Sequence, residues 1–166
     1  MPRKALLALG LVLLGGCRVH DPQKELEVTD VETYWVVDSP KGATQYISPA
    51  VRFRLHNKTK QPIRAIQAMA NFKRVGEQEN WGSAFQQVTP ASNPLGPGKD
   101  VVVVLRSDGH YSSQVSDPES MFQHQLFKDA RVEAFVRISS SGWTRMVEVA
   151  VERRIGAKSV QDLGAP

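Results

Sequence analysis

Apolar and polar residues alternate with a period of two over most of the chain after residue 25. The clearest run, residues 51–56 (VRFRLH), places three apolar side chains on one face and basic side chains on the other. This alternation is typical of β-strands with one buried face. Further runs predict strands at 26–37, 66–72, 81–88, 101–105, 132–138 and 143–151. We therefore predict an all-β domain with about seven short strands.

The first run changes phase along its length. Leu26 and Val28 stand in one phase, whereas Thr33 and Trp35 stand in the other. An extra residue in one strand shifts the phase in this way, so we expect a β-bulge near Thr29-Asp30.

The last two runs flank Ser139–Gly142, which predicts a hairpin. In its second strand Trp143 and Val147 share a face, with Arg145 as the one polar residue on it. The run 101–105 is five consecutive apolar residues, and we expect it to be a strand covered on both faces.

One helix is predicted in the segment that follows. Asp117 can cap its first turn, and Pro118 suits the first helical position because proline has no N–H to satisfy there. Phe122 and Leu126 are spaced to share a face of this helix. Short strands, turn signals and a single helical insert favour an antiparallel β-sandwich, with a closed barrel as the alternative.

The amino terminus has a different pattern. Arg3 and Lys4 precede an apolar run from Ala5 to Leu14, which is too short for a membrane span of about 20 residues. A short positive region, a short apolar run and small residues are typical of a secretory signal peptide. Gly15 and Gly16 are the small residues, and Cys17, the only cysteine in the chain, follows them.

The sequence Leu14-Gly15-Gly16-Cys17 resembles the lipobox of bacterial lipoproteins. The resemblance implies cleavage after residue 16 and acylation of Cys17, which is thus the predicted lipidation site. The alternatives are a core thiol and a signal peptide cut elsewhere. In enterobacterial lipoproteins an Asp after the cysteine retains the protein in the inner membrane. Arg18 stands there instead, which implies the outer membrane, with the domain facing the periplasm.

We therefore predict four segments: a cleaved signal peptide (1–16), a lipidated tether (17–25), a β-sandwich domain (26–155) and a flexible tail (156–166). One cysteine excludes an intramolecular disulfide. The formal charge of +4 includes Arg3 and Lys4, so the processed chain carries about +2. This balance does not indicate a nucleic-acid-binding protein.

Two further motifs carry a second resemblance. Phe53-Arg54-Leu55-His56-Asn57 and Pro94-Leu95-Gly96-Pro97-Gly98 resemble the motifs of bacterial envelope lipoproteins with FxLYD-like, immunoglobulin-type domains. The resemblance covers residues 34–154 and departs from the family pattern at positions 56 and 57, where Tyr and Asp are commoner. It implies an immunoglobulin-like sandwich and no particular activity.

The candidate chemistry is sparse, with no recognisable catalytic or cofactor-binding motif. We interpret the polar side chains between residues 107 and 124 as a turn, a helix cap and solvated histidines rather than a metal site. The same segment is long for a loop in a compact domain, and long excursions often bind partners. The partner-binding candidates are Tyr111, Met121 and Phe122.

Two other residue sets each have two interpretations. The basic residues at 52, 54, 56, 58, 60 and 64 fit an ordinary solvated strand face, with a surface facing anionic lipid headgroups as the alternative. The tryptophans Trp35, Trp81 and Trp143 fit core packing better than a ligand groove.

These patterns predict a lipid-anchored envelope protein whose domain binds another envelope protein and is not an enzyme. We expect no metal or cofactor, no nucleic-acid partner and no small-molecule substrate. The first alternative is a structural lipoprotein of an outer-membrane assembly or secretion complex. The second is a metal-dependent hydrolase.

Overall fold

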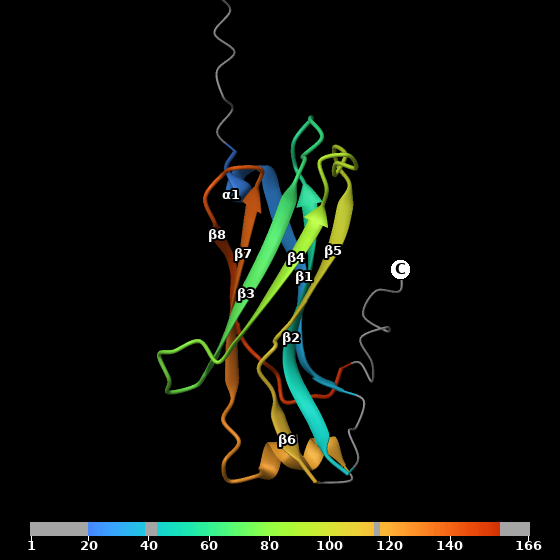
Figure 1. Ribbon diagram of the computed structural model, residues 1–166. Helices are drawn as coiled ribbons and strands as arrows, with labels where there is room; N and C mark the ends of the chain where they lie inside the picture. The colour runs from blue at the N-terminus through green and yellow to red at the C-terminus, as the bar shows by residue number, and fades with distance from the viewer. Residues whose placement is uncertain (1–19, 39–42, 115–116, 157–166) are drawn as a thin grey trace, which may run out of the picture.

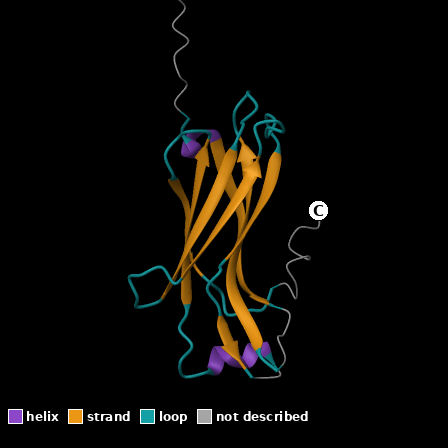
Figure 2. Cartoon of the chain, viewed as in Figure 1, coloured by secondary structure: helices purple, strands orange, loops and turns teal. Residues whose placement is uncertain are grey.

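The computed structural model describes residues 20–38, 43–114 and 117–156. Antiparallel strands form the body, and two short helices lie at opposite ends of it (Figures 1 and 2). The elements are α1 (Pro22–Glu25), β1 (Leu26–Val37), β2 (Gln45–Asn57), β3 (Ile66–Arg74), β4 (Gly82–Thr89), β5 (Asp100–Arg106), β6 (Tyr111–Ser113), the 3-10 helix η1 (Pro118–Gln123), β7 (Ala130–Ile138) and β8 (Thr144–Ala150). The predicted all-β class is confirmed.

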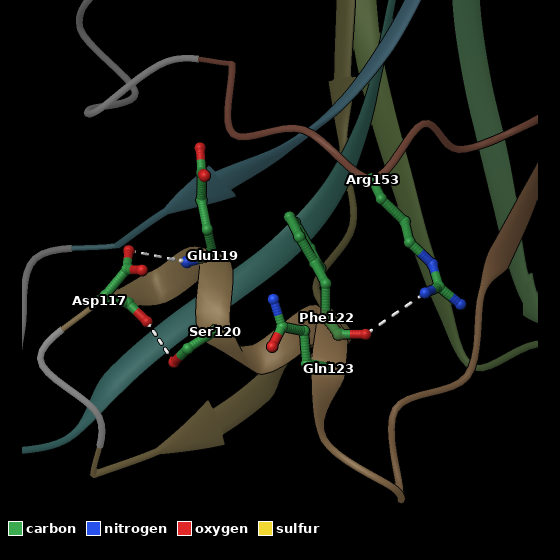
Figure 3. A pocket seen from close by; sticks show the side chains of 6 residues that line it. All are labelled: Asp117, Glu119, Ser120, Phe122, Gln123 and Arg153. Atoms are coloured by element: carbon green, nitrogen blue, oxygen red, sulfur yellow. Dashed lines mark hydrogen bonds between the residues drawn. The ribbon is translucent and has the colours of Figure 1, made fainter.

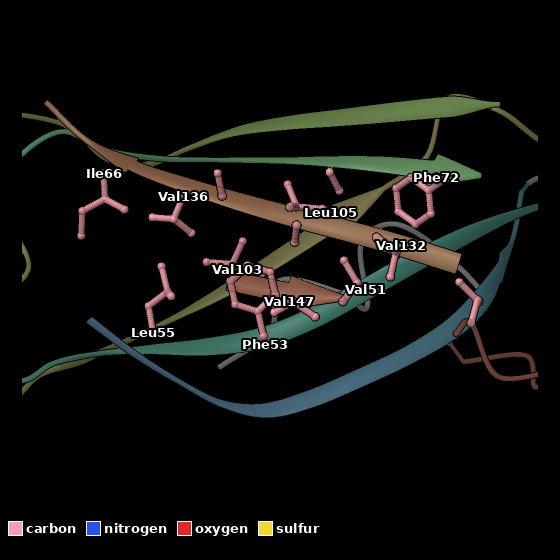
Figure 4. Close-up of a cluster of buried hydrophobic side chains, with 14 of the residues drawn as sticks. Val51, Phe53, Leu55, Ile66, Phe72, Val103, Leu105, Val132, Val136 and Val147 are labelled. Carbon is pink, nitrogen blue, oxygen red and sulfur yellow. The ribbon is translucent and has the colours of Figure 1, made fainter. Parts of the chain in front are cut away.

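The strands form two four-stranded antiparallel sheets. One sheet has the order β1-β2-β5, with β6 also paired to β2, and the other has the order β4-β3-β7-β8. Their inner faces pack into one hydrophobic cluster (Figure 4). Phe53 and Leu105 from the first sheet and Phe72 from the second are almost completely buried there. This arrangement is sandwich-like, with each sheet supplying alternate residues to the core.

The predicted bulge in β1 is confirmed. The β1–β2 register shifts between Thr29 and Glu32, and Asp30 has a φ of 51°. The shift changes which side of the strand faces inward, so that Leu26 and Trp35 are both buried in the same cluster.

The predicted face of β8 was right for Val147 and wrong for Trp143 and Arg145. The β7–β8 register shifts between Ala134 and Phe135, opposite Arg145 and Val147. This second bulge turns Arg145 to solvent while Val147 stays 6% exposed in the core. No break in the alternation of the sequence marks the bulge, because Arg145 and Val147 are two residues apart.

Two further expectations need correction. In β5, Val103 and Leu105 are buried but Val102 and Val104 are only partly covered, so that one face is more open than expected. The predicted helix is the short η1, which ends at Gln123. Leu126 therefore lies beyond it and is 72% exposed instead of sharing a face with Phe122.

The described part of the predicted tether is folded against the domain. Asp21 caps α1 by accepting a hydrogen bond from the Gln23 backbone N–H at 3.1 Å. Glu25 is 8% exposed, and its carboxylate lies 3.1 Å from Nδ1 of His20. The backbone N–H of Lys58 donates to the Glu25 carbonyl, which ties α1 to the end of β2. The folded unit thus begins no later than His20, rather than at Leu26.

Candidate interaction surfaces

Of the predicted site residues, Cys17 lies outside the described residues, as do the predicted signal peptide and most of the predicted tail. Tyr111 and Phe122 belong to a cluster of five rings around Trp35, which we call the aromatic cluster. Its members are Trp35, Trp81, Tyr111, Phe122 and Phe127, with ring centroids 4.8 to 6.2 Å apart in the contacting pairs. Aromatic pairs at such distances are stabilising beyond the area they bury.

The aromatic cluster explains why the excursion between β5 and β7 is ordered around the core. Trp35 is fully buried, and Phe122 from η1 and Phe127 pack on it. Met121 is 4% exposed within the same core, so its side chain offers no surface to a partner. Tyr111 and Phe122 are partly exposed. Their role in partner binding stays a prediction.

A shallow pocket lies beside η1, lined by Asp117, Glu119, Ser120, Phe122, Gln123 and Arg153 (Figure 3). Arg153 comes from the segment after β8 and donates to the Phe122 carbonyl at 3.4 Å. Its guanidinium also pairs with Asp129 at 2.6 Å and lies over the Phe127 ring. Because Arg153 is held by these contacts, its part in the pocket is to fasten the C-terminal segment to η1.

The described polar side chains between residues 107 and 124 do not form a cluster of metal-ligating groups. Within the described residues no three His, Cys, Asp or Glu side chains group closely enough to hold an ion. Asp117 caps η1 through the Glu119 backbone N–H at 3.1 Å. Asp108 accepts from the Ser83 backbone N–H at 2.6 Å and so joins β4 to the end of β5.

Asn57 joins the two motifs that carry the family resemblance. It is 1% exposed, and its Nδ2 lies 2.9 Å from the Gln61 carbonyl, 2.9 Å from the Leu95 carbonyl and 3.0 Å from the Gly96 carbonyl. Its Oδ1 accepts from the backbone N–H of Thr59 at 2.9 Å. The turn after β2 and the loop before β5 are therefore fastened to each other through one amide.

An apolar patch lies on the outer face of the sheet β4-β3-β7-β8. Phe85 is directly opposite Met69, and Met69 is directly opposite Phe135, so the three share a face. Phe85 is 62% exposed and contacts Trp143 with ring centroids 6.4 Å apart. We call these four residues the outer apolar face. Trp143 thus lies outside the core, unlike Trp35.

The sheet edges are protected along part of their length. The C-terminal segment covers part of β1. The backbone N–H of Trp35 donates to the Arg154 carbonyl at 2.8 Å, and the Trp35 carbonyl accepts from the Gly156 N–H at 3.0 Å. On the other side, the Gln86 side chain accepts from the Val104 backbone N–H at 3.3 Å. Bulges and such contacts hinder the addition of an outside strand, so the outer apolar face is the better candidate for a partner.

Most cations of the described residues are paired with carboxylates. Arg52 and Arg54, weighed above as a basic face, pair with Glu32 and Asp30. His56 pairs with Asp100 at 2.5 Å. These contacts are those of a solvated, charge-balanced strand face, as interpreted from the sequence.

Three carboxylates elsewhere have shifted pKa values. The hydrogen bond from Lys73 holds the pKa of Glu133 below its usual value, and the hydrogen bond from Arg153 does the same for Asp129. Lys128 lowers the pKa of Glu77 in the same way. These ion pairs favour the charged carboxylates and oppose protonation in the folded state.

The described Lys and Arg side chains without a carboxylate partner gather at one end of the domain. Among the described residues, five Lys and Arg side chains have no carboxylate within ion-pair distance: Lys58, Lys60, Arg64, Lys99 and Arg137. They come from the β2–β3 and β4–β5 loops and the end of β7, which meet near α1 (Figure 1). We call this end of the domain the basic end.

Direct contacts hold these loops together. Arg64 donates to the Ala91 carbonyl at 2.7 Å, and the Ser139 backbone N–H donates to the Ala65 carbonyl at 3.0 Å. Nζ of Lys58 donates to the Gln23 carbonyl in α1 at 3.0 Å. The basic end is therefore one surface built from four segments that are distant in sequence.

None of the helices in the described part of the chain has the length and hydropathy that a membrane crossing requires. No protein family model and no curated protein matches the sequence. A crystal structure assigned to ApaA of Bordetella pertussis is similar with a TM-score of 0.41 and 12% identity, over 79% of this chain and 94% of that chain. The structure of a structural-genomics target is similar with a TM-score of 0.39 and 6% identity, over 80% and 86% of the two chains. Such distant similarity carries no argument about function.

Proposed function

We propose that this protein is a lipid-anchored envelope lipoprotein whose β-sandwich domain is a non-catalytic binding module. The observation that carries the proposal is the sequence Leu14-Gly15-Gly16-Cys17 behind a positively charged start and a short apolar run. The fold is compatible with it, because α1 (Pro22–Glu25) is fastened to the domain by the Lys58 N–H to Glu25 carbonyl bond, only a few residues after Cys17. Acylation at Cys17 would therefore hold the domain directly at a bilayer.

The immunoglobulin-type kinship is part of the same proposal. The two motifs of the resemblance lie far apart in sequence, yet Asn57 bonds to the carbonyls of Leu95 and Gly96. Both motifs therefore take part in joining the turn after β2 to the loop before β5, which supports a shared architecture with the FxLYD-like domains.

The outer apolar face is the surface that we assign to the protein partner. Its aromatic rings lie on a sheet rather than in a deep pocket, and Arg137 stacks over the Trp143 ring at 4.6 Å. Tryptophan, arginine and other large side chains with partial exposure are typical of the centres of protein interfaces. The partner in this proposal is another protein of the cell envelope.

Membrane fractionation of the wild type and of Cys17→Ala tests the anchor. We expect the wild type in the membrane fraction and an unprocessed Cys17→Ala precursor of higher mass. A Cys17→Ala protein that is processed and fractionated like the wild type would overturn the proposal. Arg18→Asp is the matched variant for location. If enterobacterial sorting applies, it moves the protein from the outer to the inner membrane while processing is unchanged.

A further inference from the structure

We propose that the basic end docks on the anionic phospholipid headgroups of the leaflet that holds the anchor. This inference rests on the proposed lipidation of Cys17. Two residues separate Cys17 from His20, and the three steps along the chain between them span at most about 11 Å in any conformation. The end of the domain that carries α1 must then lie close to the headgroups, and it is the same end that gathers the cations without carboxylate partners.

The local charges at this end favour anions. Lys60 and Lys99 are exposed, and neither has a described carboxylate partner. Asp100, the nearest carboxylate in sequence, faces both His56 at 2.5 Å and Arg54 at 3.8 Å. Asp21 pairs with Lys24 at 3.2 Å. Glu27, opposite His56 in the β1–β2 register, is exposed on the adjoining sheet face. The end as a whole keeps an excess of positive charge.

Among the described residues, the side chains without ion-pair partners toward the opposite end are carboxylates instead of cations. Asp117 and Glu119 on η1 have no ion pair within the described part of the chain, and neither does the exposed Glu79 in the β3–β4 loop. Figure 1 shows η1 at the end of the body away from α1. The domain is therefore electrically polarised along its long axis, and an anionic surface attracts the end with α1 and repels the end with η1.

Each basic residue near an anionic membrane surface strengthens binding by about fivefold in the docking equilibrium constant. Removing three lysines thus lowers this constant by about 100-fold. The attraction is screened within about 10 Å at 0.1 M salt, so docking requires close approach and weakens in high salt. Docking holds the body with η1 pointing away from the bilayer.

The test uses the processed full chain in vesicles of phosphatidylcholine, with or without about 30% phosphatidylglycerol, which supplies anionic headgroups. A water-soluble amine-reactive ester labels Lys24 at the basic end and Lys128 near η1, and mass spectrometry gives the ratio of the two rates. We expect the Lys24/Lys128 ratio to fall at least about threefold with phosphatidylglycerol and to recover in high salt. Lys58→Gln/Lys60→Gln/Lys99→Gln removes the fall, whereas the control Arg52→Gln/Arg131→Gln/Arg154→Gln, which loses the same charge away from α1, keeps it.

Flotation of the same samples separates the two proposals. If the protein does not float with phosphatidylcholine vesicles, the anchor is absent, and both the proposed function and the docking built on it are overturned. If it floats but the ratio is the same in both vesicles, or the lysine variant behaves like the wild type, only the docking is overturned. Thermal melting of both triple variants verifies that the fold is intact.

Discussion

The side-chain amide of Asn57 donates to the backbone carbonyl of Leu95 at 2.9 Å, across 38 residues of sequence. Ile63 and Leu95 form an isolated β-bridge beside this contact, with N–H to carbonyl distances of 2.9 and 2.8 Å. The turn after β2 and the loop before β5 are thus closed on each other, and this closure shapes the surface from which Lys58 and Lys99 project.

Asn57→Ala removes the amide hydrogen bonds to the carbonyls of Gln61, Leu95 and Gly96, each of which keeps its second donor, and the bond that Oδ1 accepts from Thr59. Each hydrogen bond of this kind contributes about 0.5–1.5 kcal/mol, so the loss of several should lower the free energy of unfolding by about 3 kcal/mol. Urea denaturation measures it. Asn93→Ala, at an exposed position in the same loop, is the control and should change stability by less than about 0.5 kcal/mol. Equal effects of the two variants would contradict the role of Asn57.

Gly109 is needed where β4 approaches the end of β5. A Cβ at this position would lie 2.7 Å from the Trp81 carbonyl oxygen and 3.2 Å from Gly82 Cα, so the backbone would have to move. Overpacking of this kind costs about 1–3 kcal/mol, and we expect Gly109→Ala to lower the melting temperature. Gly142→Ala is the matched control, because nothing lies within 4 Å of its added Cβ. A melting temperature unaffected by Gly109→Ala would show that the two segments are not in close contact.

The ion pairs of Asp129, just before β7, and of Glu133 on β7 predict a loss of stability in acid. The pKa values of Asp129 and Glu133 are lowered in the folded state by Arg153 and Lys73. Their stabilising contribution is therefore complete above the unfolded pKa values of about 4 and decreases as the pH falls through that range.

Urea denaturation between pH 3 and 6 measures this dependence. Asp129→Asn/Glu133→Gln should flatten the curve below about pH 5, while Glu79→Gln, at an exposed loop position, should follow the wild type. A double variant with the wild-type slope would exclude these carboxylates as the cause.

The outer apolar face predicts a separable binding defect. Phe85→Ser removes a side chain that is 62% exposed, so stability should change little while binding of the envelope partner falls at least about tenfold, as for interface hot spots. Leu126→Ser is the matched control, because Leu126 is 72% exposed but lies after η1. Site-specific cross-linking in cells from position 87 on the same strand identifies the partner. Phe85→Ser should abolish the product, and Leu126→Ser should leave it intact.

The sequence was sufficient for seven of the eight described strands because their alternation reflects burial directly, but it did not predict the short β6 (Tyr111–Ser113). It also predicted the β1 bulge, since the phase change between Val28 and Thr33 is visible in the residues themselves. The β8 bulge leaves no such mark, and neither does the early end of η1, where packing of Phe122 and Phe127 on Trp35 takes priority over helix extension.

The interaction surfaces were less predictable. The sequence indicates Tyr111, Met121 and Phe122 as binding candidates because they belong to a long excursion. In the structure Met121 lies in the core, and the two rings belong to the aromatic cluster. The outer apolar face depends on which residues of β3, β4 and β7 are directly opposite, and one strand alone does not contain that information. The basic end likewise depends on which cations lack carboxylate partners after folding.

The intact mass of the protein isolated from membranes tests the central claim most directly. The account predicts a chain that begins at Cys17, with the added mass of acyl groups on its N-terminal residue. The peptide that contains Cys17 should release this mass on hydrolysis of its ester bonds. A chain that begins at any other residue, or a Cys17 peptide without acyl groups, would contradict it.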